Sequence, residues 1–546
     1  MKMSKRGMAI AHSTIVIVLG ALSASLSPAA SAFSFELGGD GGIKGAFDTD
    51  ITYGYMRRMQ SAQPDTKATS YGNRALFPDR GDELSNAVRF SHTLELKRGD
   101  SGFLARGNYF YDDAYGDKIL PPGNNRRLMR GSDLTDAVFY TKLGDTVTLR
   151  VGKQVINWGE STFIQGGIAD INTFDLTKLR TPGADLKDAY IGAKAIDMSW
   201  SDNNWTVEGF TLFKFDPIRV DAMGSPFAGL DAIGDGGGWD AGGDGVVGGG
   251  CRASDNPIPA PGTPRCDILG GGLVRVGDRR PSGNGQWGIA VRKFFPEFFN
   301  GGEVAVYAQN LNDHLPMIST YGKSGQYFVD YPADIRRYGI SFNTNVASLA
   351  IGGEYSIRKD APIQLLAPLL NGRVTAAVAP GSYQQGWTTS NRHQLQFTVQ
   401  KNWGIVYPLG ADAGNSIIEV AFGKLSNLPT TGLFEPTLTK SWSGFQMKHS
   451  LTYQAALFNL VALTPNFAYR WDMRGNSNEL GGAKAFVAGR RATTIGLDFD
   501  YMGGRYRGGI GYTVFNGQHV EKNAANSLLN GGYDRDFLQA NVSISF

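Results

Sequence analysis

The sequence predicts an all-β protein, a transmembrane antiparallel up-and-down β-barrel of about 18 strands, within a range of about 16–20. Three observations predict it. Segments of about ten residues alternate apolar and polar side chains. The connections alternate between short turns and long polar segments, and the last segment keeps one apolar face and ends on an aromatic residue, Phe546. Short turns at one rim and long loops at the other are typical of membrane barrels.

The C-terminal segment at 536–546 shows this alternation clearly. One face carries Leu538, Ala540, Val542, Ile544 and Phe546, and the other carries Gln539, Asn541, Ser543 and Ser545. In a soluble protein this strand would expose an apolar edge, whereas in a barrel its apolar face meets lipid. The last strand of a soluble β-sandwich is the alternative. We expect Val542 to pair with the first strand, 43–58, and close the barrel. The terminal aromatic resembles the signal of bacterial outer-membrane barrels, so we expect contact with the barrel-assembly machinery.

The N-terminus predicts export. Lys2, Lys5 and Arg6 precede an apolar run at 14–22, and Ala30-Ser31-Ala32 is a small-x-small cleavage site. Residues 1–32 therefore have the form of a secretory signal peptide, with the barrel at 33–546. A retained anchor is the alternative, which the short apolar run disfavours. We expect the bacterial outer membrane as the location, with lipid and lipopolysaccharide around the barrel.

The chain repeats one theme of strand, short turn, strand and long segment. The long segments are 114–133, 155–186, 217–285, 312–335, 360–390, 426–443, 474–490 and 517–535. The eighteen predicted strands are 43–58, 86–98, 101–113, 134–143, 146–154, 187–200, 204–216, 286–294, 302–311, 336–346, 348–359, 391–403, 416–425, 444–457, 462–473, 491–502, 504–516 and 536–546. An even number places both ends of the barrel at the same rim.

Charged residues spaced at period two between apolar ones are expected to face the lumen, because a charge at the lipid midplane costs about 2–4 kcal/mol. Such residues either pair across strands and stabilise the wall or line a selective passage. The residues assigned to the lumen are Arg89, Arg106, Arg150, Arg337, Glu354, Arg358, Asp498, Arg505 and Arg507.

Charge and composition exclude some classes of function. Of the 53 basic residues three lie in the predicted signal peptide, which has no acidic residue, so the remainder has 50 basic against 50 acidic residues. Nucleic-acid binding, which needs a basic excess, is not expected. The sequence predicts no cofactor and no metal among the site residues.

The longest loop, 217–285, holds the two cysteines of the chain. Cys251 and Cys266 are expected to form a disulfide in an oxidising compartment. The same loop carries Asp231, Asp235, Asp240 and Asp244 among glycines. Oxygen-rich flexible segments of this kind bind calcium in some proteins, but a flexible surface loop is the simpler interpretation.

The loop 155–186 has the most distinctive composition of the long segments. It mixes Trp158, Phe163 and Ile164 with charged residues. Because apolar loop residues need cover, we expect this loop to fold into the barrel and constrict or plug the pore. Asn157, Trp158, Glu160, Lys178 and Arg180 are the candidates for contacting a solute; a packing loop that stiffens the barrel is the alternative.

Two stretches resemble a known family. They are Phe33–Leu37 followed by Phe47–Gly54, and Gly152–Phe163 continuing to Lys178–Leu186. Both are similar to a Gram-negative outer-membrane family labelled domain of unknown function 1302. The resemblance implies an outer-membrane protein of about this length and supplies no catalytic residues.

The function expected from these features is a channel or transporter for a solute, with aromatic loop residues favouring an amphipathic or hydrophobic one. A barrel with a plugged lumen that docks a periplasmic partner is the alternative. An outer-membrane hydrolase is less favoured, because His92, His393 and His449 share the phase of apolar neighbours and no serine-nucleophile motif accompanies them.

Overall fold

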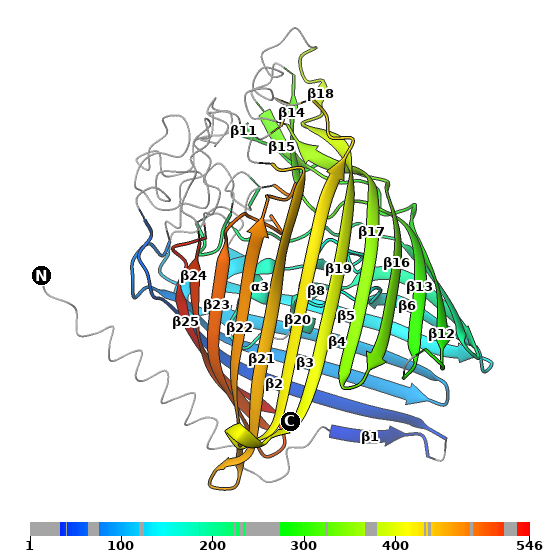
Figure 1. Ribbon diagram of the computed structural model, residues 1–546, viewed down its shortest axis with the longest axis vertical. Coiled ribbons are helices and arrows are strands. Elements are labelled where there is room, and N and C mark those ends of the chain that lie inside the picture. Colours follow the sequence, from blue (N-terminus) through cyan, green and yellow to red (C-terminus); the bar gives the residue numbers. More distant parts are fainter. Residues whose placement is uncertain are drawn as a thin grey trace, which may run out of the picture.

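The computed structural model shows a barrel of long tilted strands (Figure 1). The strands form because apolar and polar residues alternate along them, so that one face is apolar and the other polar. The structure describes residues 33–39, 41–63, 76–118, 125–184, 186–222, 224–229, 233–234, 274–298, 300–322, 326–365, 379–430, 433–434, 438–480, 484–517 and 532–546.

The main sheet of the described chain has 19 strands. The first, β1 (Phe33–Leu37), pairs only with the start of β2 and lies outside the ring. The remaining eighteen form the barrel, as predicted: β2 (Ile43–Arg58), β3 (Glu83–Arg98), β4 (Ser101–Asp112), β5 (Arg130–Leu143), β6 (Val147–Gln154), β9 (Ala193–Asp202), β10 (Trp205–Leu212), β12 (Gln286–Phe295), β13 (Gly302–Leu311), β16 (Ile335–Val346), β17 (Leu349–Gln364), β19 (Trp387–Val406), β20 (Ala411–Ser426), β21 (Ser441–Leu457), β22 (Val461–Arg474), β23 (Arg491–Tyr501), β24 (Tyr506–Asn516) and β25 (Phe537–Ser545).

The predicted closure of the barrel is confirmed. β25 pairs antiparallel with β2, and Val542 lies opposite Tyr53. Thr52 and Ser543 add a hydroxyl hydrogen bond of 2.8 Å on the lumenal side of this seam. All neighbouring strands in the ring run antiparallel, so the described ring has no open edge between β2 and β25.

The predicted strand positions agree with the structure, and the ends differ. The predicted strand at 187–200 is wrong at its start, because Leu186–Ala189 forms a helical turn, α4, and β9 begins at Ala193. β10 ends at Leu212, four residues before the predicted end at 216. Conversely, β17 continues to Gln364 across a bulge, because Asp360 takes a positive φ of 59° and the pairing resumes at Ala361.

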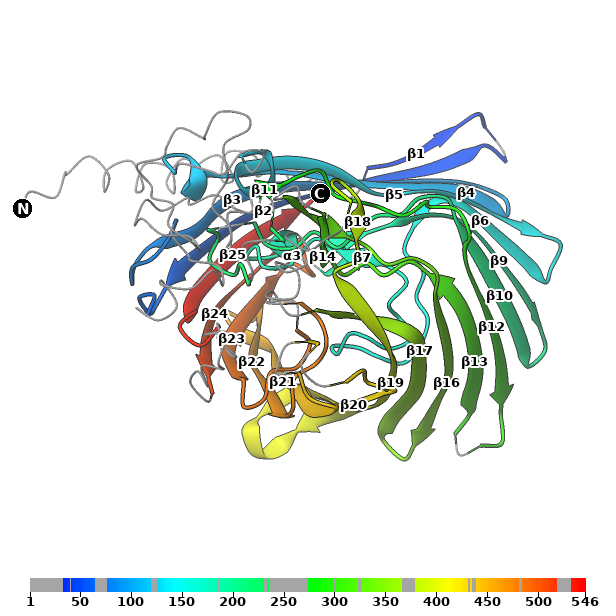
Figure 2. The ribbon, with the colours of Figure 1, turned by 90° about the horizontal axis from the view of Figure 1, so that it is seen from above.

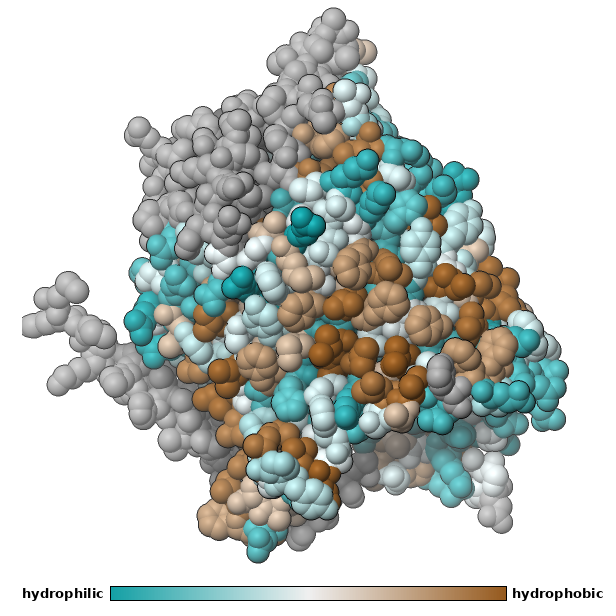
Figure 3. Space-filling view, viewed as in Figure 1, coloured by the Kyte–Doolittle hydropathy of each residue, from teal (hydrophilic) through white to brown (hydrophobic). Residues whose placement is uncertain are grey.

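The outer face of the wall is apolar. On β13, Val304 and Val306 are exposed whereas Ala305 and Tyr307, which alternate with them, are buried. In the face shown in Figure 3, apolar side chains form a broad band around the middle of the barrel. An apolar outer surface of this kind is suited to lipid contact. Among the described residues no helix is long and apolar enough to cross a membrane.

The two rims differ. One rim carries short turns, such as Gly99-Asp100 and Met502–Arg505. At the other rim, a small sheet of β11 (Val274–Arg275), β14 (Met317–Tyr321), β15 (Gln326–Asp330) and β18 (Tyr383–Gln384) stands above the strands (Figure 1).

Several sequence predictions fall outside the described residues. They are the signal peptide at 1–32, the disulfide between Cys251 and Cys266, and the calcium interpretation of the loop 217–285, whose Asp231, Asp235, Asp240 and Asp244 are not described.

Candidate functional site

The chain between β6 and β9 enters the barrel. This inward loop, residues 155–192 of which all but 185 are described, carries β7 (Thr173–Phe174), α3 (Leu176–Leu179), α4 and β8 (Tyr190–Ile191). Figure 2 shows these elements inside the ring of strands. Ile156, Ile164, Ile168 and Ile171 are buried. Backbone groups of a loop in this position need hydrogen-bond partners, and the wall supplies them.

Glu419 of β20 is the strongest of these partners. The Glu419 side chain is fully buried, and its carboxylate accepts three consecutive backbone N–H groups of the inward loop. The donors are Thr162 at 2.6 Å, Phe163 at 3.0 Å and Ile164 at 2.7 Å. Hydrogen bonds to an ionised acceptor are about twice as strong as neutral ones. The arrangement therefore fixes this turn of the loop against the wall.

Glu354 of β17 acts in the same way on the neighbouring segment. Its carboxylate accepts the backbone N–H of Glu160 at 2.8 Å and that of Ile168 at 3.0 Å. Between these two glutamates, Gln396 of β19 donates to the carbonyl of Ile164 at 2.8 Å. Three adjacent strands thus present one polar surface that is complementary to the backbone of the loop.

A third anchor is an ion cluster at Asp170. Arg337 Nη1 donates to the Asp170 backbone carbonyl at 2.7 Å and lies 3.5 Å from its carboxylate, which Arg358 also contacts. Burial alone would raise the pKa of Asp170, but the guanidinium groups of Arg358 and Arg337 hold it well below its usual range. Asp170 is therefore charged at neutral pH and binds both arginines.

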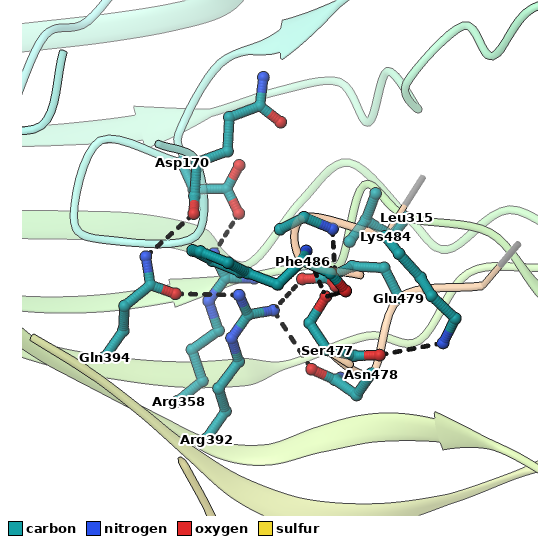
Figure 4. Close-up of polar contacts among 12 residues, drawn as sticks. Asp170, Leu315, Arg358, Arg392, Gln394, Ser477, Asn478, Glu479, Lys484 and Phe486 are labelled. Carbon is teal, nitrogen blue, oxygen red and sulfur yellow. Dashed lines mark hydrogen bonds and ion pairs between the residues drawn. The ribbon is translucent and has the colours of Figure 1, made fainter. Parts of the chain in front are cut away.

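The connection between β22 and β23, of which residues 475–480 and 484–490 are described, packs into the same region. Glu479 forms a buried ion pair with Arg392 of β19, and Asn478 lies beside it at 3.3 Å from the same guanidinium (Figure 4). Burial would raise the pKa of Glu479, yet Arg392 and nearby donors lower it to about 2. Two loops from distant parts of the chain are therefore held by arginines on adjacent strands, β17 and β19.

Glycines on the inner wall make this close packing possible. A Cβ at Gly339 of β16 would lie 2.6 Å from the Ile168 side chain, and a Cβ at Gly54 of β2 would lie 2.5 Å from the Pro182 carbonyl. Both distances are below van der Waals contact. The absence of a side chain at these two positions therefore allows the inward loop to approach the wall on two sides of the lumen.

The predicted solute contacts have different environments. Asn157 is exposed, and Glu160 is half-buried and accepts a hydrogen bond from Asn343 at 3.0 Å. Burial raises the pKa of Glu160 above its usual value. Trp158, between them, is only 2% exposed and packs against Phe210 and Tyr307. In this structure Trp158 therefore supports the loop and does not face open lumen, contrary to the expectation from its position between polar residues.

The other two predicted contacts anchor the far end of the inward loop. Lys178 Nζ contacts the carboxylate of Asp133 and donates to Asn108 at 2.9 Å. Arg180 pairs with Asp221 at 3.1 Å. The structure therefore separates the five predicted residues into two groups at different ends of the loop.

Most of the predicted lumenal charges are paired, and three of the arginines pair with the inward loop instead of with another strand. Arg507 is 3.1 Å from Asp50, and Asp498 accepts a hydrogen bond from Asn466. Arg505 lies in the turn before β24, so it belongs to the rim and not to a wall strand. The remaining pairs are Arg89–Asp188, Arg106–Asp136, Arg150–Asp197, Arg337–Asp170 and Arg358–Asp170, while Glu354 holds the loop.

A cavity of about 330 Å³ lies where the inward loop leaves the wall uncovered. One side is formed by the loop residues Gly183, Ala184, Lys187 and Asp188. The other side is the inner wall near the short-turn rim: Asp50, Thr52, Ser91, Thr464, Asp498, Phe499, Asp500, Arg507, Gly508, Asn541 and Ser543. The sequence reasoning missed Asp188 and Lys187 because it placed both on a strand.

The exterior histidines each contact a hydroxyl group on a neighbouring strand. His92 lies 2.9 Å from Thr49, His449 lies 2.7 Å from Ser416, and His393 lies 2.8 Å from Ser426. The recurrence of one arrangement at three places indicates that the hydroxyls satisfy imidazole nitrogens on an apolar face.

These features define the class: an antiparallel transmembrane β-barrel whose lumen is partly filled by one of its own loops. The family model described as "Protein of unknown function (DUF1302)" matches residues 14–546. The chain belongs to this family, which confirms the resemblance seen in the sequence. No curated protein matches the chain significantly.

Solved structures with some likeness include OccAB2 of Acinetobacter baumannii and OpdK of Pseudomonas aeruginosa with vanillate, both at 8% identity, with TM-scores of 0.41 and 0.43. A BenF-like porin from Pseudomonas fluorescens Pf-5 has 8% identity and a TM-score of 0.42. In each case 92% of this chain and 98% of that chain are covered. At these values the likeness does not transfer a function to this chain.

Proposed function

We propose that the protein is an outer-membrane channel that passes a solute, with the inward loop narrowing the lumen. One observation carries the proposal. Inside a closed barrel, the loop is bound to one part of the wall through Glu354 and Glu419, and a polar cavity remains between its tip and another part of the wall. A barrel of this strand number is wide enough for an aqueous channel unless loops fill it.

The lining of the cavity suggests a polar solute. Of the aromatic loop residues that favoured a hydrophobic solute, Trp158 is 2% exposed. The residues around the cavity are aspartates, a lysine, an arginine, serines, threonines and an asparagine, with Phe499 as the large apolar member. A passage through this region favours solutes that hydrogen-bond or carry charge.

Conductance measurements test this proposal. The full mature chain, folded and reconstituted into planar bilayers, is expected to conduct, and deletion of residues 157–182 is expected to raise the conductance. A correctly folded barrel that stays sealed both before and after the deletion would contradict the proposal.

A plugged barrel that docks a periplasmic partner is the second candidate. The observation that favours it is the β1–β2 hairpin at the short-turn rim, where Phe33 is 65% exposed and Leu37 is 57% exposed. Under this proposal the protein would not conduct, and an envelope protein would co-purify with the full chain but not with a variant carrying Phe33→Ser and Leu37→Ser. Conduction without such a partner would support the channel instead.

A further inference from the structure

The cavity beside the inward loop is acidic. Four carboxylates border it, Asp50, Asp188, Asp498 and Asp500, against two cations, Lys187 and Arg507. The formal charge of this lining is the difference between two and four, or −2. The carboxylates come from β2, β23 and the inward loop; the loop adds one charge of each sign, Lys187 and Asp188, so the net charge of −2 belongs to the wall.

The two cations do not neutralise the carboxylates of β23. Arg507 is engaged with Asp50 at 3.1 Å. Asp498 accepts from the Asn466 amide at 2.8 Å, and Asp500 accepts from the backbone N–H of Gly504 at 2.8 Å. Both donors are neutral, and within the described residues neither carboxylate has a cation within ion-pair distance. Asp498 and Asp500 therefore carry negative charge without a direct ion pair at the short-turn side of the cavity, and Lys448 acts on Asp498 electrostatically from beyond ion-pair distance.

Asp188 provides an independent sign of a missing partner. Its side chain is 7% exposed, and one carboxylate oxygen accepts from Arg89 Nη1 at 3.0 Å. The other oxygen, Oδ1, is buried without a hydrogen-bond partner among the described residues. Leaving a buried acceptor unsatisfied costs about 1–3 kcal/mol, and more for a charged group. A solute donor would reach this oxygen only if the side chains that cover it moved, because the atom has almost no accessible surface.

The size of the cavity restricts the solute. At about 330 Å³ it is at the small end of the range that proteins use for small molecules, roughly 300–1,000 Å³. Thr52, Ser91, Asn541 and Ser543 offer hydroxyl and amide groups on the wall opposite Asp188. The lining therefore suits a small solute with several polar groups.

From these observations we infer that the cavity is the selectivity site of the channel and takes a small polar solute with a positively charged amino or guanidinium group. Asp498 and Asp500 accept the N–H donors of this cation, and Asp188, paired with Arg89, borders the site. The inference rests on the proposed channel function and adds the charge class of the solute to it.

Ion selectivity of the reconstituted full chain tests the inference. Under a potassium chloride gradient, the reversal potential of the wild type is expected to show preference for potassium. Asp498→Asn and Asp500→Asn are expected to lower the ratio of cation to anion permeability by at least about twofold, more strongly at low salt, where screening is weaker. Lys187→Gln, which removes a cation from the same cavity, is expected to raise the ratio. In liposome swelling, free lysine should enter faster than glutamate.

Control variants separate a local effect from a general one. Asp360→Asn removes an exposed aspartate at the long-loop rim, where Asp360 pairs with Arg336, and should leave selectivity unchanged. Folding of each variant is checked by the heat-modifiable mobility of the barrel. A conducting wild type that prefers chloride, or whose selectivity is unaffected by Asp498→Asn, Asp500→Asn and Lys187→Gln, would overturn the inference while the channel function stands. A folded barrel that stays sealed both as wild type and after deletion of residues 157–182 would overturn the channel function itself.

Discussion

Replacing Glu419 tests whether the inward loop is held by the wall. Glu419→Gln preserves size but keeps only one acceptor oxygen, and it turns an amide N–H₂ toward the backbone donors of Thr162, Phe163 and Ile164. Each hydrogen bond to a charged group contributes about 1.5–3 kcal/mol. With one or two of the three lost, docking of this segment should weaken by roughly 1.5–6 kcal/mol, a change of at least about tenfold in the ratio of docked to free loop.

Two measurements report this change. Limited proteolysis should cut the loop of Glu419→Gln faster than that of the wild type, and single-channel recordings should show larger or noisier currents. The barrel itself should keep its heat-modifiable mobility, because the pairing of β20 with β19 and β21 involves backbone groups. Glu95→Gln is the matched control, since in the described part of the chain Glu95 of β3 accepts a hydrogen bond from Tyr140 of the wall and not from the loop. Equal cleavage rates in wild type and Glu419→Gln would refute the reasoning, whether or not the protein conducts.

Three further predictions concern packing, pH and chemistry. Gly339→Ala should accelerate hydrogen exchange in the inward loop, because its Cβ would lie 2.6 Å from Ile168. Gly209→Ala is the control and should not accelerate exchange, because the nearest atom to its Cβ would be 3.6 Å away. Equal exchange in the two variants would contradict the packing argument. Because the pKa of Glu479 is lowered, its ion pair with Arg392 contributes fully to stability above the ordinary pKa of 4.5 and is lost as the pH falls toward about 2. Hydrogen exchange in residues 475–490, corrected for intrinsic rates, should therefore rise only below pH 4.5. A rise near neutral pH would contradict this prediction. Phospholipid vesicles should show no ester hydrolysis with either wild type or Ser426→Ala, and hydrolysis that disappears in Ser426→Ala would reinstate a role for His393.

The barrel could be predicted from the sequence because each strand shows, within its own residues, which face is apolar and which is polar. The alternation along β13 or β25 can be recognised from adjacent residues alone, and so can a short turn such as Met502–Arg505. Strand ends were less predictable. β17 extends to Gln364 because its pairing with β19 continues after a bulge at Asp360. Local alternation of apolar and polar residues does not predict this continuation.

The site was less predictable because it depends on distant parts of the chain. The entry of the loop into the lumen follows from its apolar residues, which need cover. Its anchors do not, since Glu419 and Ile164 are separated by 255 positions and meet only in the register of the closed barrel. Burial of Trp158 depends on Phe210 and Tyr307 in the same way. The cavity is the part of the lumen that the inward loop leaves unfilled, and no local sequence pattern predicts its position.

The seam between β2 and β25 has a consequence for how the barrel assembles. Thr52 and Ser543 meet across 491 positions of sequence. For a flexible chain, bringing such ends together costs roughly 5–6 kcal/mol of entropy, and contacts of this range slow folding. Until the seam forms, two long strand edges with unpaired N–H and C=O groups remain open, and in lipid such groups are costly. Insertion and closure should therefore be concerted, and a chain that loses β25 should expose the edges of β2 and β24 together.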